Sequence, residues 1–386
     1  MQKKLVYILN QYSNKEGSHF YHVLRLLEEI AKHGVEVALV IEKAKDIPVF
    51  DIPNIQVIAQ KQNGIKRFFE LFSILKELNK QGYKKTFIRI SQNGAIPAIL
   101  VSKLYGGEVY YWQSGQGHIL DKQKPLNFEK IKWYLKSKIP FEFVKKYTDY
   151  FVTGPESMLD YYEEVVGVRR EKLRCLYNDI DLNRFKILNE NEKDKIKNEL
   201  NIPKDKKIIL FVHRLSPVRK SLYYMPFVVE KVLKENKDYI CYVIGGGSEL
   251  EQLRKLVKEK HLENQIFILG ERPNKEIHKF YQISDVFINP TFTEGFPRVL
   301  IEAMASGLPI VTTNAGGIKD ILAKKQKEFM VDKNDREAFA KKLEELIKNE
   351  NIQKELSKEN LERVKRYSTE NVAKMYVNVI FGEKNG

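Results

Sequence analysis

Short β-rich segments alternate with amphipathic helical stretches along this 386-residue sequence, and the pattern predicts an α/β fold. A first series contains LVYILN, VEVALVIE, IQVIAQ, TFIRI, EVYYWQ and YFVTG, separated by helical stretches such as FYHVLRLLEEIAKHG. A second series contains IILFVHRL, YICYVIGG, QIFILG, DVFINP and PIVTTN. Because such alternation is typical of a parallel sheet covered by helices, the two series predict two doubly wound, Rossmann-like domains.

The polar, lysine- and asparagine-rich stretch ILNENEKDKIKNELNIPKDKK separates the two series and marks the predicted domain boundary. We therefore expect a first domain over residues 1–187 and a second over residues 188–365. From Asp335 onward the sequence indicates helices with no strand between them. We expect the last of these helices, within residues 366–386, to pack back on the first domain.

Composition and charge restrict the class of protein. With 43% hydrophobic and 30% charged residues, the chain is suited to two globular domains. It has no apolar run near the roughly 18 residues that span a bilayer, and MQKKLVYILNQYSN reaches polar residues too soon for a secretory signal. Cys175 and Cys241 lie far apart, which favours reduced thiols and a cytoplasmic location. The net charge of +15 is not concentrated in a nucleic-acid reader motif, so we expect no nucleic-acid partner.

The span TFTEGFPRVLIEAMASGLPIVTTNAGG, residues 291–317, predicts a loop, a helix, a turn and a strand. Pro297 suits the first turn of the helix, and Gly307 marks its end. The N-terminus of such a helix favours an anion such as phosphate. Glu294 lies before it and Glu302 lies inside it, and carboxylates accept hydrogen bonds from sugar hydroxyls. A phosphate flanked by sugar rings would suit these features, and the alternative is a surface helix with two solvated glutamates.

The loops that follow the predicted strands are the expected ligand sites, since open parallel sheets bind ligands beyond the carboxyl ends of their strands. IILFVHRLSPVRKS ends a strand and supplies His213, Arg214, Arg219 and Lys220. Arginine can bind two diphosphate oxygens at once, and lysine adds a mobile point charge. Gly246 in YVIGGGSE permits close backbone approach after the next strand. Each feature alone is often structural, but together they favour a diphosphate site.

These motifs resemble glycosyltransferase family 4, through HRLSPVRK, GGGSE, LGERPNKEIHKFY, SDVFINPTFTEGFPRVLIEAMASGLPIV and NAGGIKD. The paired glutamates fit the family's E-x7-E signature. The resemblance implies a GT-B fold, in which two Rossmann-like domains face an interdomain cleft. It also implies retaining transfer of a hexose-type sugar from a nucleoside-diphosphate sugar of the UDP or GDP type.

The resemblance further implies a role for each matching residue. Arg214 and Lys220 would bind the donor's diphosphate, and Glu302 would bind its ribose hydroxyls. Glu294 and the Gly295–Phe296 backbone would hold the transferred sugar.

Three residues depart from the family's pattern in this half of the chain. Pro297 replaces the commoner glycine and removes an N–H donor, and Ser221 replaces the glycine after the lysine. His213 replaces the glycine before the arginine. None of these changes removes a charged ligand, and His213 and Gly246 stay among the candidate donor-binding residues.

The first half of the sequence carries a weaker resemblance. NKEGSHFYHVLRLL resembles the family's acceptor-domain glycine loop, with Gly17 and Ser18 in place of the usual glycine pair. Gly17 would let the chain approach the transferred sugar or phosphate. Many relatives carry a histidine near the place of Ser114, and His118 follows four residues later. His118 is therefore a candidate active-site residue, the alternative being an ordinary loop histidine.

We expect no metal ion and no other cofactor. NDIDLNRF contains a D-x-D triplet of the kind that holds metal in another glycosyltransferase fold, but it matches this family's N-G-V-D-x-x-x-F connector, with Asp179 in place of glycine. His19 and His22 are spaced as metal ligands on a helix, yet no carboxylate or cysteine cluster accompanies them. The cationic side chains and the helix dipole would stabilise the leaving diphosphate without a metal.

The segment over residues 121–147 suggests where the protein acts. Its eight lysines are interleaved with Phe128, Trp133, Tyr134, Phe141 and Phe143. Such a segment suits an anionic membrane surface, whereas the alternative is a helix whose aromatic side chains face the domain core. We expect peripheral attachment to the inner face of the cytoplasmic membrane and a lipid-linked or cell-envelope glycan, or a glycolipid, as acceptor. A non-catalytic nucleotide-sugar-binding subunit and, from charge alone, a nucleic-acid-binding protein remain as alternatives.

Overall fold

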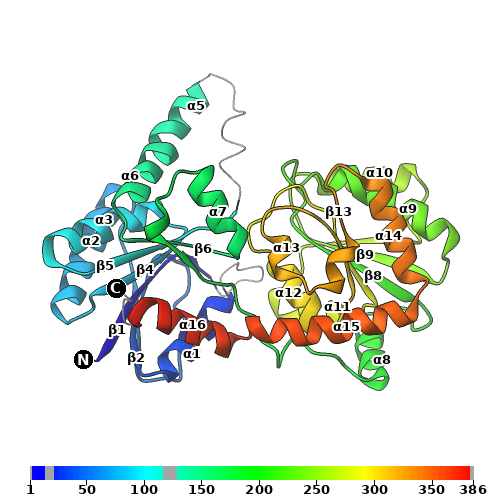
Figure 1. Ribbon diagram of the computed structural model, residues 1–386, viewed down its shortest axis with the longest axis horizontal. Coiled ribbons are helices and arrows are strands. Elements are labelled where there is room, and N and C mark those ends of the chain that lie inside the picture. The colour runs from blue at the N-terminus through cyan, green and yellow to red at the C-terminus, as the bar shows by residue number, and fades with distance from the viewer. Residues whose placement is uncertain (1, 14–20, 116–127, 383–386) are drawn as a thin grey trace. The chain divides into compact units, whose positions relative to one another are not determined.

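The chain forms two compact units, each built around one parallel sheet with helices on both faces (Figure 1). The computed structural model describes residues 2–13, 21–115 and 128–382. The first unit comprises Met1–Tyr177 and Thr369–Gly386, and the second comprises Asn178–Ser368. The predicted α/β fold with two Rossmann-like domains is confirmed.

Seven strands form the sheet of the first unit, and every neighbouring pair is parallel. In spatial order they are β3 (Ile55–Ala59), β2 (Val35–Ala44), β1 (Lys3–Tyr12), β4 (Lys85–Arg89), β5 (Glu108–Trp112), β6 (Tyr150–Thr153) and β7 (Leu173–Cys175). The central strands are buried on both faces, with every side chain of 5–9 and 37–41 in the interior. This explains why they are continuous hydrophobic runs rather than alternating sequences. The order of the strands reverses between β1 and β4.

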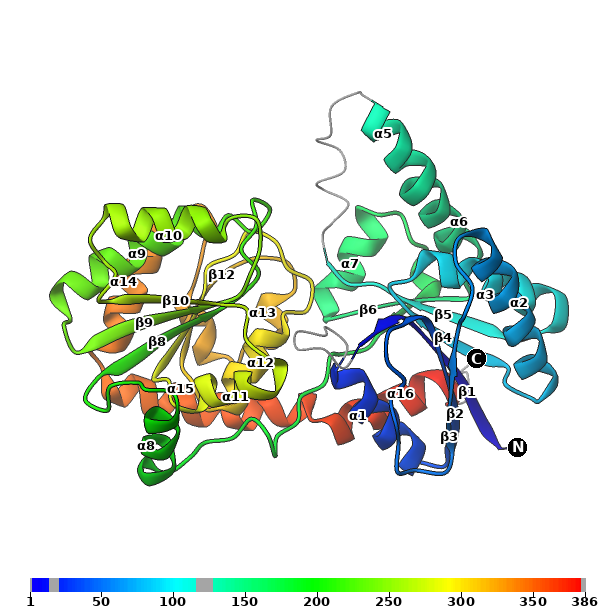
Figure 2. The ribbon, with the colours of Figure 1, turned by 180° about the vertical axis from the view of Figure 1, so that it is seen from behind.

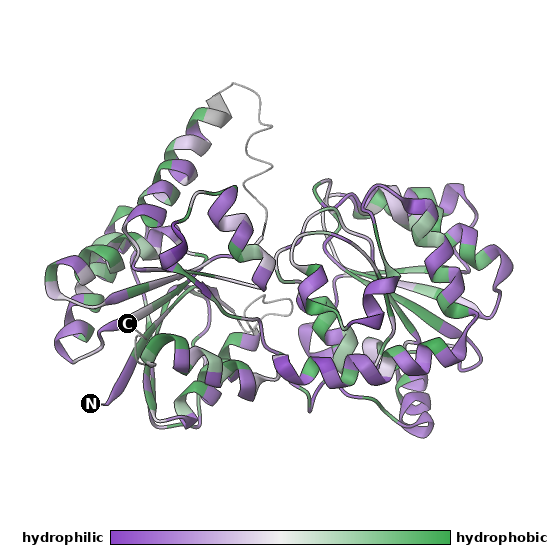
Figure 3. Ribbon diagram, viewed as in Figure 1, coloured by the Kyte–Doolittle hydropathy of each residue, from purple (hydrophilic) through white to green (hydrophobic). Residues whose placement is uncertain are grey.

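Helices cover both faces of this sheet. They are α1 (Tyr21–Lys32), α2 (Ile65–Lys80), α3 (Gln92–Tyr105), α5 (Phe128–Trp133), α6 (Ile139–Tyr147), α7 (Glu156–Glu164) and α16 (Thr369–Phe381), with a π-helical segment η1 (Tyr134–Lys138) and a 3-10 turn η2 (Arg170–Lys172). On one face, α2, α3 and α6 share a hydrophobic core with Val6 and Ile8 of β1. On the other, Tyr7 stacks on Phe87, whose ring lies 5.1 Å from Tyr376 of α16. The helices alternate between hydrophilic and hydrophobic colours in Figure 3, as amphipathic helices do.

Six parallel strands form the sheet of the second unit. In spatial order they are β10 (Ile266–Gly270), β9 (Tyr239–Ile244), β8 (Lys207–Val212), β11 (Val286–Asn289), β12 (Ile310–Thr313) and β13 (Met330–Val331). The helices are α8 (Glu190–Glu199), α9 (Ser221–Glu235), α10 (Leu250–Glu259), α11 (Asn274–Gln282), α12 (Arg298–Ala305), α13 (Ile318–Ile321), α14 (Arg336–Ile347) and α15 (Glu350–Val364), with 3-10 turns η3 (Lys325–Phe329) and η4 (Lys365–Tyr367). Figure 2 shows them on both faces of the sheet, whose order reverses between β8 and β11.

The boundaries between the two units differ from those that the sequence suggested, which were residues 187/188 and 365/366. The second unit begins at Asn178 and ends at Ser368. The connector belongs to it because Ile180 forms a parallel bridge with Ser368 and donates its N–H to the Tyr367 carbonyl at 2.8 Å. These contacts join segments far apart in the sequence, so local composition could not reveal them. The helix α16 that follows belongs to the first unit, where it packs against α1.

No helix in the described part of the chain combines the length and apolarity that a membrane span requires.

Candidate functional site

The candidate site lies at the carboxyl edge of the second sheet, where the strand order reverses between β8 and β11. In open parallel sheets, ligands bind in the crevice at this switch point. The loop after β8 begins with His213, and the loop after β11 carries Glu294 into helix α12. Pro297 directly precedes the first residue of α12, as the sequence suggested for a helix start.

The Glu294 carboxylate is the centre of this edge, and its residue is only 8% exposed. His213 Nε2 lies 2.6 Å from Glu294 Oε1, and the Arg219 guanidinium contacts the same oxygen while also donating to the Thr293 carbonyl. Burial alone would raise the pKa of Glu294. The hydrogen bond from His213, the charge of Arg219 and the N–H of Gly295 outweigh burial, so the pKa lies below its ordinary value. Glu294 is therefore held as a carboxylate.

The His213 ring is held at both of its nitrogens. Its Nδ1 lies 3.2 Å from the Arg214 carbonyl oxygen, while Nε2 faces Glu294. A carbonyl and a carboxylate can only accept hydrogen bonds, so each ring nitrogen faces an acceptor. This arrangement fixes the ring against the loop after β11.

Glycines allow the neighbouring loops to pack on these residues. Gly245 and Gly247 have φ values of 140° and 141°, and a Cβ on either would lie within 2 Å of a carbonyl oxygen, that of His213 or of Leu215. The carbonyl of Gly246 accepts the Leu215 N–H at 2.8 Å. The close backbone approach suggested for the glycine triplet therefore occurs between the loops after β8 and β9.

The two expected diphosphate ligands, Arg214 and Lys220, have exposed side chains. Lys220 adopts a left-handed conformation, with φ 53°, directly before helix α9. Its Nζ lies 4.4 Å from the centre of the Phe292 ring, and the Phe292 N–H donates to the Arg219 carbonyl at 3.3 Å. These contacts join the segment that carries both cations to the loop that carries Glu294.

Glu302 lies on α12 with both carboxylate oxygens facing neighbouring side chains. Tyr281 donates its hydroxyl to Oε2 at 3.0 Å, and Arg298 Nε lies 3.8 Å from Oε1. Arg298 also donates to the Asp179 carbonyl at 2.7 Å. Asp179 thus takes part in fixing the connector to α12, the structural role that the sequence comparison favoured over a metal site.

Phe296 packs into the second unit, where it is 6% exposed and its ring lies 5.5 Å from that of Tyr367. The Phe296 carbonyl accepts a hydrogen bond of 3.1 Å from Asn178 Nδ2. The N–H of Gly295 bonds to the Glu294 carboxylate. Both of these backbone groups thus have partners within the chain. The predicted contact of the Gly295–Phe296 backbone with a sugar stays a prediction.

The predicted site residues have three different outcomes in the structure: one pair is in contact, four others lie on the same unit, and three lie outside the described residues. His213 meets Glu294, and Arg214, Lys220, Gly246 and Glu302 lie on the same unit. Three further predicted residues, Gly17, Ser18 and His118, lie outside the described residues. Within the described ranges, no group of three or more histidine, cysteine, aspartate or glutamate side chains could hold a metal ion.

The sequence did not predict that three residues contact the two glutamates, namely Arg219, Tyr281 and Arg298. Arg298 precedes Glu302 by four residues on one helix, and this spacing places two side chains on the same face. Arg219 adjoins Lys220 in the motif that already drew attention. Tyr281 ends the motif LGERPNKEIHKFY, but only the tertiary packing of α11 near α12 shows that it reaches Glu302.

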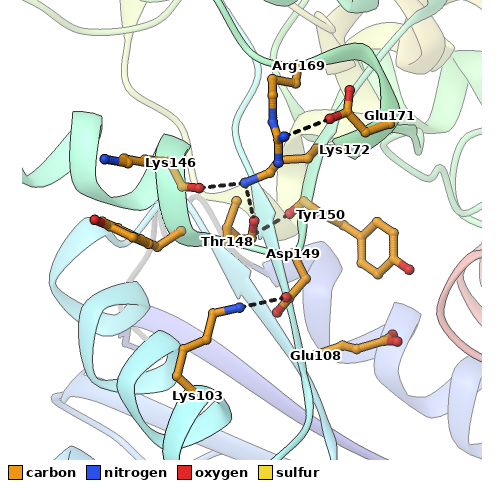
Figure 4. A pocket seen from close by; sticks show the side chains of 10 residues that line it. Lys103, Glu108, Lys146, Thr148, Asp149, Tyr150, Arg169, Glu171 and Lys172 are labelled. Carbon is orange, nitrogen blue, oxygen red and sulfur yellow. Dashed lines mark hydrogen bonds and ion pairs between the residues drawn. The ribbon is translucent and has the colours of Figure 1, made fainter.

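A charged cavity of about 380 Å³ in the first unit is a different kind of site (Figure 4). Lys172 donates to the carbonyls of Lys146 and Thr148 at 2.6 and 2.8 Å, and Lys103 lies 3.3 Å from the carboxylate of Asp149. The cavity lies where β5, β6 and β7 begin, at the edge opposite the expected ligand edge. Lys103 pairs with Asp149 and Arg169 pairs with Glu171, so we assign the cavity a structural role.

Comparison with known proteins gives a family match that lies within the second unit. Residues 192–363 match the family described as glycosyl transferases group 1. The chain is 27% identical over 236 residues to a D-inositol 3-phosphate glycosyltransferase of Corynebacterium urealyticum, covering 59% of this chain and 55% of that protein. It is 30% identical over 185 residues to an uncharacterized glycosyltransferase of Haemophilus influenzae, covering 48% and 51%. The chain thus spans about half the length of these curated relatives.

Solved structures match over nearly the whole chain. The Anabaena protein HepE in complex with UDP and glucose has a TM-score of 0.74 and 14% identity, covering 98% of this chain and 99% of HepE. A sucrose-phosphate synthase from Thermosynechococcus elongatus has a TM-score of 0.76 and 17% identity, covering 98% of both chains. At these identities the likeness concerns the fold alone, and the predicted GT-B architecture is confirmed.

Proposed function

We propose that this chain, whose residues 192–363 match the family described as glycosyl transferases group 1, is a retaining glycosyltransferase. It moves a hexose-type sugar from a nucleoside-diphosphate sugar to a lipid-linked or cell-envelope glycan acceptor. The observation that carries the proposal is the contact of buried Glu294 with His213 and Arg219 at the switch point of the second sheet. The loop and the helix that carry the two glutamates of the E-x7-E signature lie at this edge of the sheet, where ligands are expected to bind.

The donor's diphosphate is the charge that the site must stabilise. Arg214 and Lys220 are exposed cations at the carboxyl edge of the second sheet, where a diphosphate can reach them. As the bond between the anomeric carbon and the diphosphate oxygen breaks, they stabilise the negative charge on the departing nucleoside diphosphate. HepE, which shares the fold, was crystallised with UDP and with UDP-glucose, and this supports a donor of the UDP type.

Glu302 and Glu294 act on different parts of the donor. Glu302, held by Tyr281, accepts hydrogen bonds from the ribose hydroxyls of the nucleotide. Glu294 accepts hydrogen bonds from the transferred sugar, and its partners His213 and Arg219 fix its orientation. The acceptor hydroxyl forms its bond on the face that the diphosphate leaves, and its proton passes to the departing phosphate oxygen. The configuration at the anomeric carbon is then retained.

The segment α5–η1–α6 supports attachment to a membrane surface. Four of its apolar side chains are strongly exposed and lie at positions i, i+3, i+4 and i+8, namely Ile131, Tyr134, Leu135 and Ile139. Figures 1 and 2 both show α5 projecting away from the sheet of the first unit. An exposed apolar stripe among lysines is typical of helices that lie in the interface of an anionic bilayer. We propose peripheral attachment of this segment to the inner face of the cytoplasmic membrane.

The structure corrects the residues that sequence reasoning assigned to this surface. Phe141 is 2% exposed and belongs to the core of the first unit, and Phe143 is half-buried with its ring 4.8 Å from that of Tyr147. The aliphatic side chains of the stripe replace them as the apolar contact. Composition alone could not distinguish the buried aromatic side chains from the exposed apolar ones, because both kinds alternate with lysines along the same segment.

The experiment that tests the enzymatic proposal is a screen for nucleoside-diphosphate release with the full chain and a panel of nucleotide sugars. The hit is then combined with glycan and glycolipid acceptors, and the anomeric configuration of the product is read by NMR. Release that requires donor and acceptor supports the proposal. Binding of the donor without turnover under any acceptor would instead indicate a nucleotide-sugar-binding subunit.

Vesicle sedimentation tests the membrane proposal. We expect binding to anionic vesicles at low salt, lost when Leu135 and Ile139 are both replaced by asparagine. Leu104→Asn is the matched control, because Leu104 is 67% exposed on α3 of the same unit and lies outside the stripe. Equal sedimentation of the double variant and the wild type, or none for either, would contradict it.

A further inference from the structure

The first unit contains a cavity of about 360 Å³ that the donor site does not use. Glu42 near the end of β2, the first turns of α2 and the first turn of α3 line it. It therefore lies at the carboxyl edge of the first sheet, close to the reversal of strand order between β1 and β4, where such sheets bind ligands. Its volume is near the lower end of the ~300–1,000 Å³ typical of small-molecule pockets.

Glu42 is a buried carboxylate with unsatisfied hydrogen-bonding capacity. It is 3% exposed, and among the described residues its Oε1 has no hydrogen-bond partner. Burial raises the pKa of Glu42, and the hydrogen bond with Ser91 and the charges of Lys43 and Arg67 offset this only in part. A buried acceptor without a partner costs free energy, so a ligand that donates a hydrogen bond to this oxygen would be stabilised here.

Two features of the backbone mark this edge, namely a close approach at Gly94 and a strained conformation at Ile90. Gly94 occupies the first turn of α3, and a Cβ there would lie 2.4 Å from Glu42 Oε1. Ile90, just after β4, has φ 65°, a conformation that a β-branched residue rarely adopts. Strain of this kind collects at ligand-binding sites, where the surrounding fold must hold it in place.

The opposite wall supplies a fixed cation and apolar surface. Arg67 donates to the Gln62 carbonyl at 3.1 Å and to Asn63 Oδ1 at 2.7 Å, so its guanidinium is anchored at the start of α2. The half-buried ring of Phe68 and the side chain of Leu71 follow on the same helix. This wall therefore offers both a donor group and an apolar face.

The combination of groups selects the ligand class. A carboxylate, a guanidinium and the exposed amide of Asn93 can bind hydroxyl groups, while Phe68 and Ile96 suit the C–H faces of a sugar ring. The Glu42 carboxylate would repel a phosphate group, so a neutral ring is favoured over an anion. We propose that this cavity is the subsite for one sugar ring of the acceptor, with Glu42 accepting a hydrogen bond from a ring hydroxyl. This inference rests on the proposed glycosyltransferase function.

The test is Glu42→Gln in the full chain, because glutamine keeps the shape and removes the charge. We expect the acceptor KM to rise about tenfold or more, since a hydrogen bond to a charged acceptor is lost, while the donor KM changes less than twofold. Glu77→Gln is the matched control, because Glu77 lies on α2 in an exposed pair with Lys80. It should change neither constant.

Stability measurements separate a binding role from a structural one. Because one oxygen of the buried Glu42 carboxylate lacks a partner among the described residues, removing the charge should leave the Tm of Glu42→Gln unchanged or raise it. A fall in Tm with parallel losses in the donor and acceptor constants would show a structural role and overturn the proposal. If Glu42→Gln does not fold, Asn93→Ala at the exposed rim provides the second test, and an unchanged acceptor KM would overturn the proposal.

A donor-free measurement distinguishes failure of this subsite from failure of the proposed function. Methyl hexopyranosides are titrated into the wild type and Glu42→Gln and followed by saturation-transfer NMR. Binding that the variant loses supports the subsite even if no nucleotide sugar is turned over. Equal binding by both proteins, or no binding by the wild type, would overturn the subsite and leave the glycosyltransferase proposal intact.

Discussion

Replacing Arg219 by methionine tests whether the guanidinium is needed to keep Glu294 charged in the interior. Methionine preserves much of the apolar stem of arginine and removes only its cationic end. In the native chain the Glu294 side chain is 9% exposed and the Arg219 side chain 28% exposed. The variant therefore leaves a buried carboxylate with fewer partners.

The cost follows from the contacts that remain. Removing one partner of a buried ion pair costs about 3–5 kcal/mol in proteins. The hydrogen bonds from His213 and the Gly295 N–H persist, and the partly exposed position of Arg219 admits water. We therefore expect a loss of about 2 kcal/mol in the unfolding free energy of the second unit, roughly 30-fold in its folding constant.

The loss should depend on pH in a defined direction. The lowered pKa of Glu294 contributes stability above the ordinary value of 4.5 and loses it as pH falls through the folded pKa. Without Arg219, burial is opposed by fewer groups and the pKa of Glu294 rises. The variant should therefore be furthest below the wild type near neutral pH, and the difference should shrink as pH falls below 4.5.

The assay must report on the second unit alone. Both tryptophans, Trp112 and Trp133, lie in the first unit, so tryptophan fluorescence is unsuitable. Hydrogen exchange of the β8 and β11 amides in urea measures the second unit directly. Arg254→Met is the control, because Arg254 forms an exposed pair with Glu251 and should change stability by less than ~0.5 kcal/mol. A loss no larger than that of the control, or one independent of pH, would refute the reasoning.

Three further predictions concern catalysis. Tyr281→Phe removes a hydrogen bond that orients Glu302 and should raise the donor KM about fivefold, for roughly 1 kcal/mol, with a smaller effect on kcat; an unchanged KM would contradict this. Arg214→Ala and Lys220→Ala should each lower kcat/KM for nucleoside-diphosphate release by at least ~100-fold, since both stabilise the leaving group, and near-normal kinetics would remove the assignment. EDTA should leave activity largely intact, whereas a complete block that only a divalent ion reverses would return attention to Asp179 and Asp181.

The fold could be predicted because strand and helix periodicities are local properties of the sequence. The strands of both sheets that matched the predicted series are long enough to show buried apolar runs, whereas β13 has two residues and carries no such signal. The limits of the two units were displaced because they depend on the pairing of Ile180 with Ser368. That pairing joins segments separated by most of the second unit.

The candidate site was predictable to the extent that its residues follow strands or share a helix. Glu294 and Lys220 were found because loops at carboxyl edges bind ligands, and both lie in such loops. The partners of Glu294 were harder to predict, because Arg219 reaches it across two loops that meet only in the folded unit. Glu42 gave no signal at all, since a single acidic residue at the end of an apolar strand does not reveal that one of its oxygens is buried without a partner.

The two buried carboxylates both lie at the carboxyl edge of their sheet but differ in how they are satisfied. Glu294 has a histidine and an arginine as partners, and these compensate its charge. An anionic diphosphate can therefore bind at the same edge without facing an uncompensated carboxylate. Glu42 has one oxygen without a partner among the described residues, and a neutral hydroxyl can satisfy it. This difference in compensation favours an anionic donor in the second unit and a neutral sugar ring in the first.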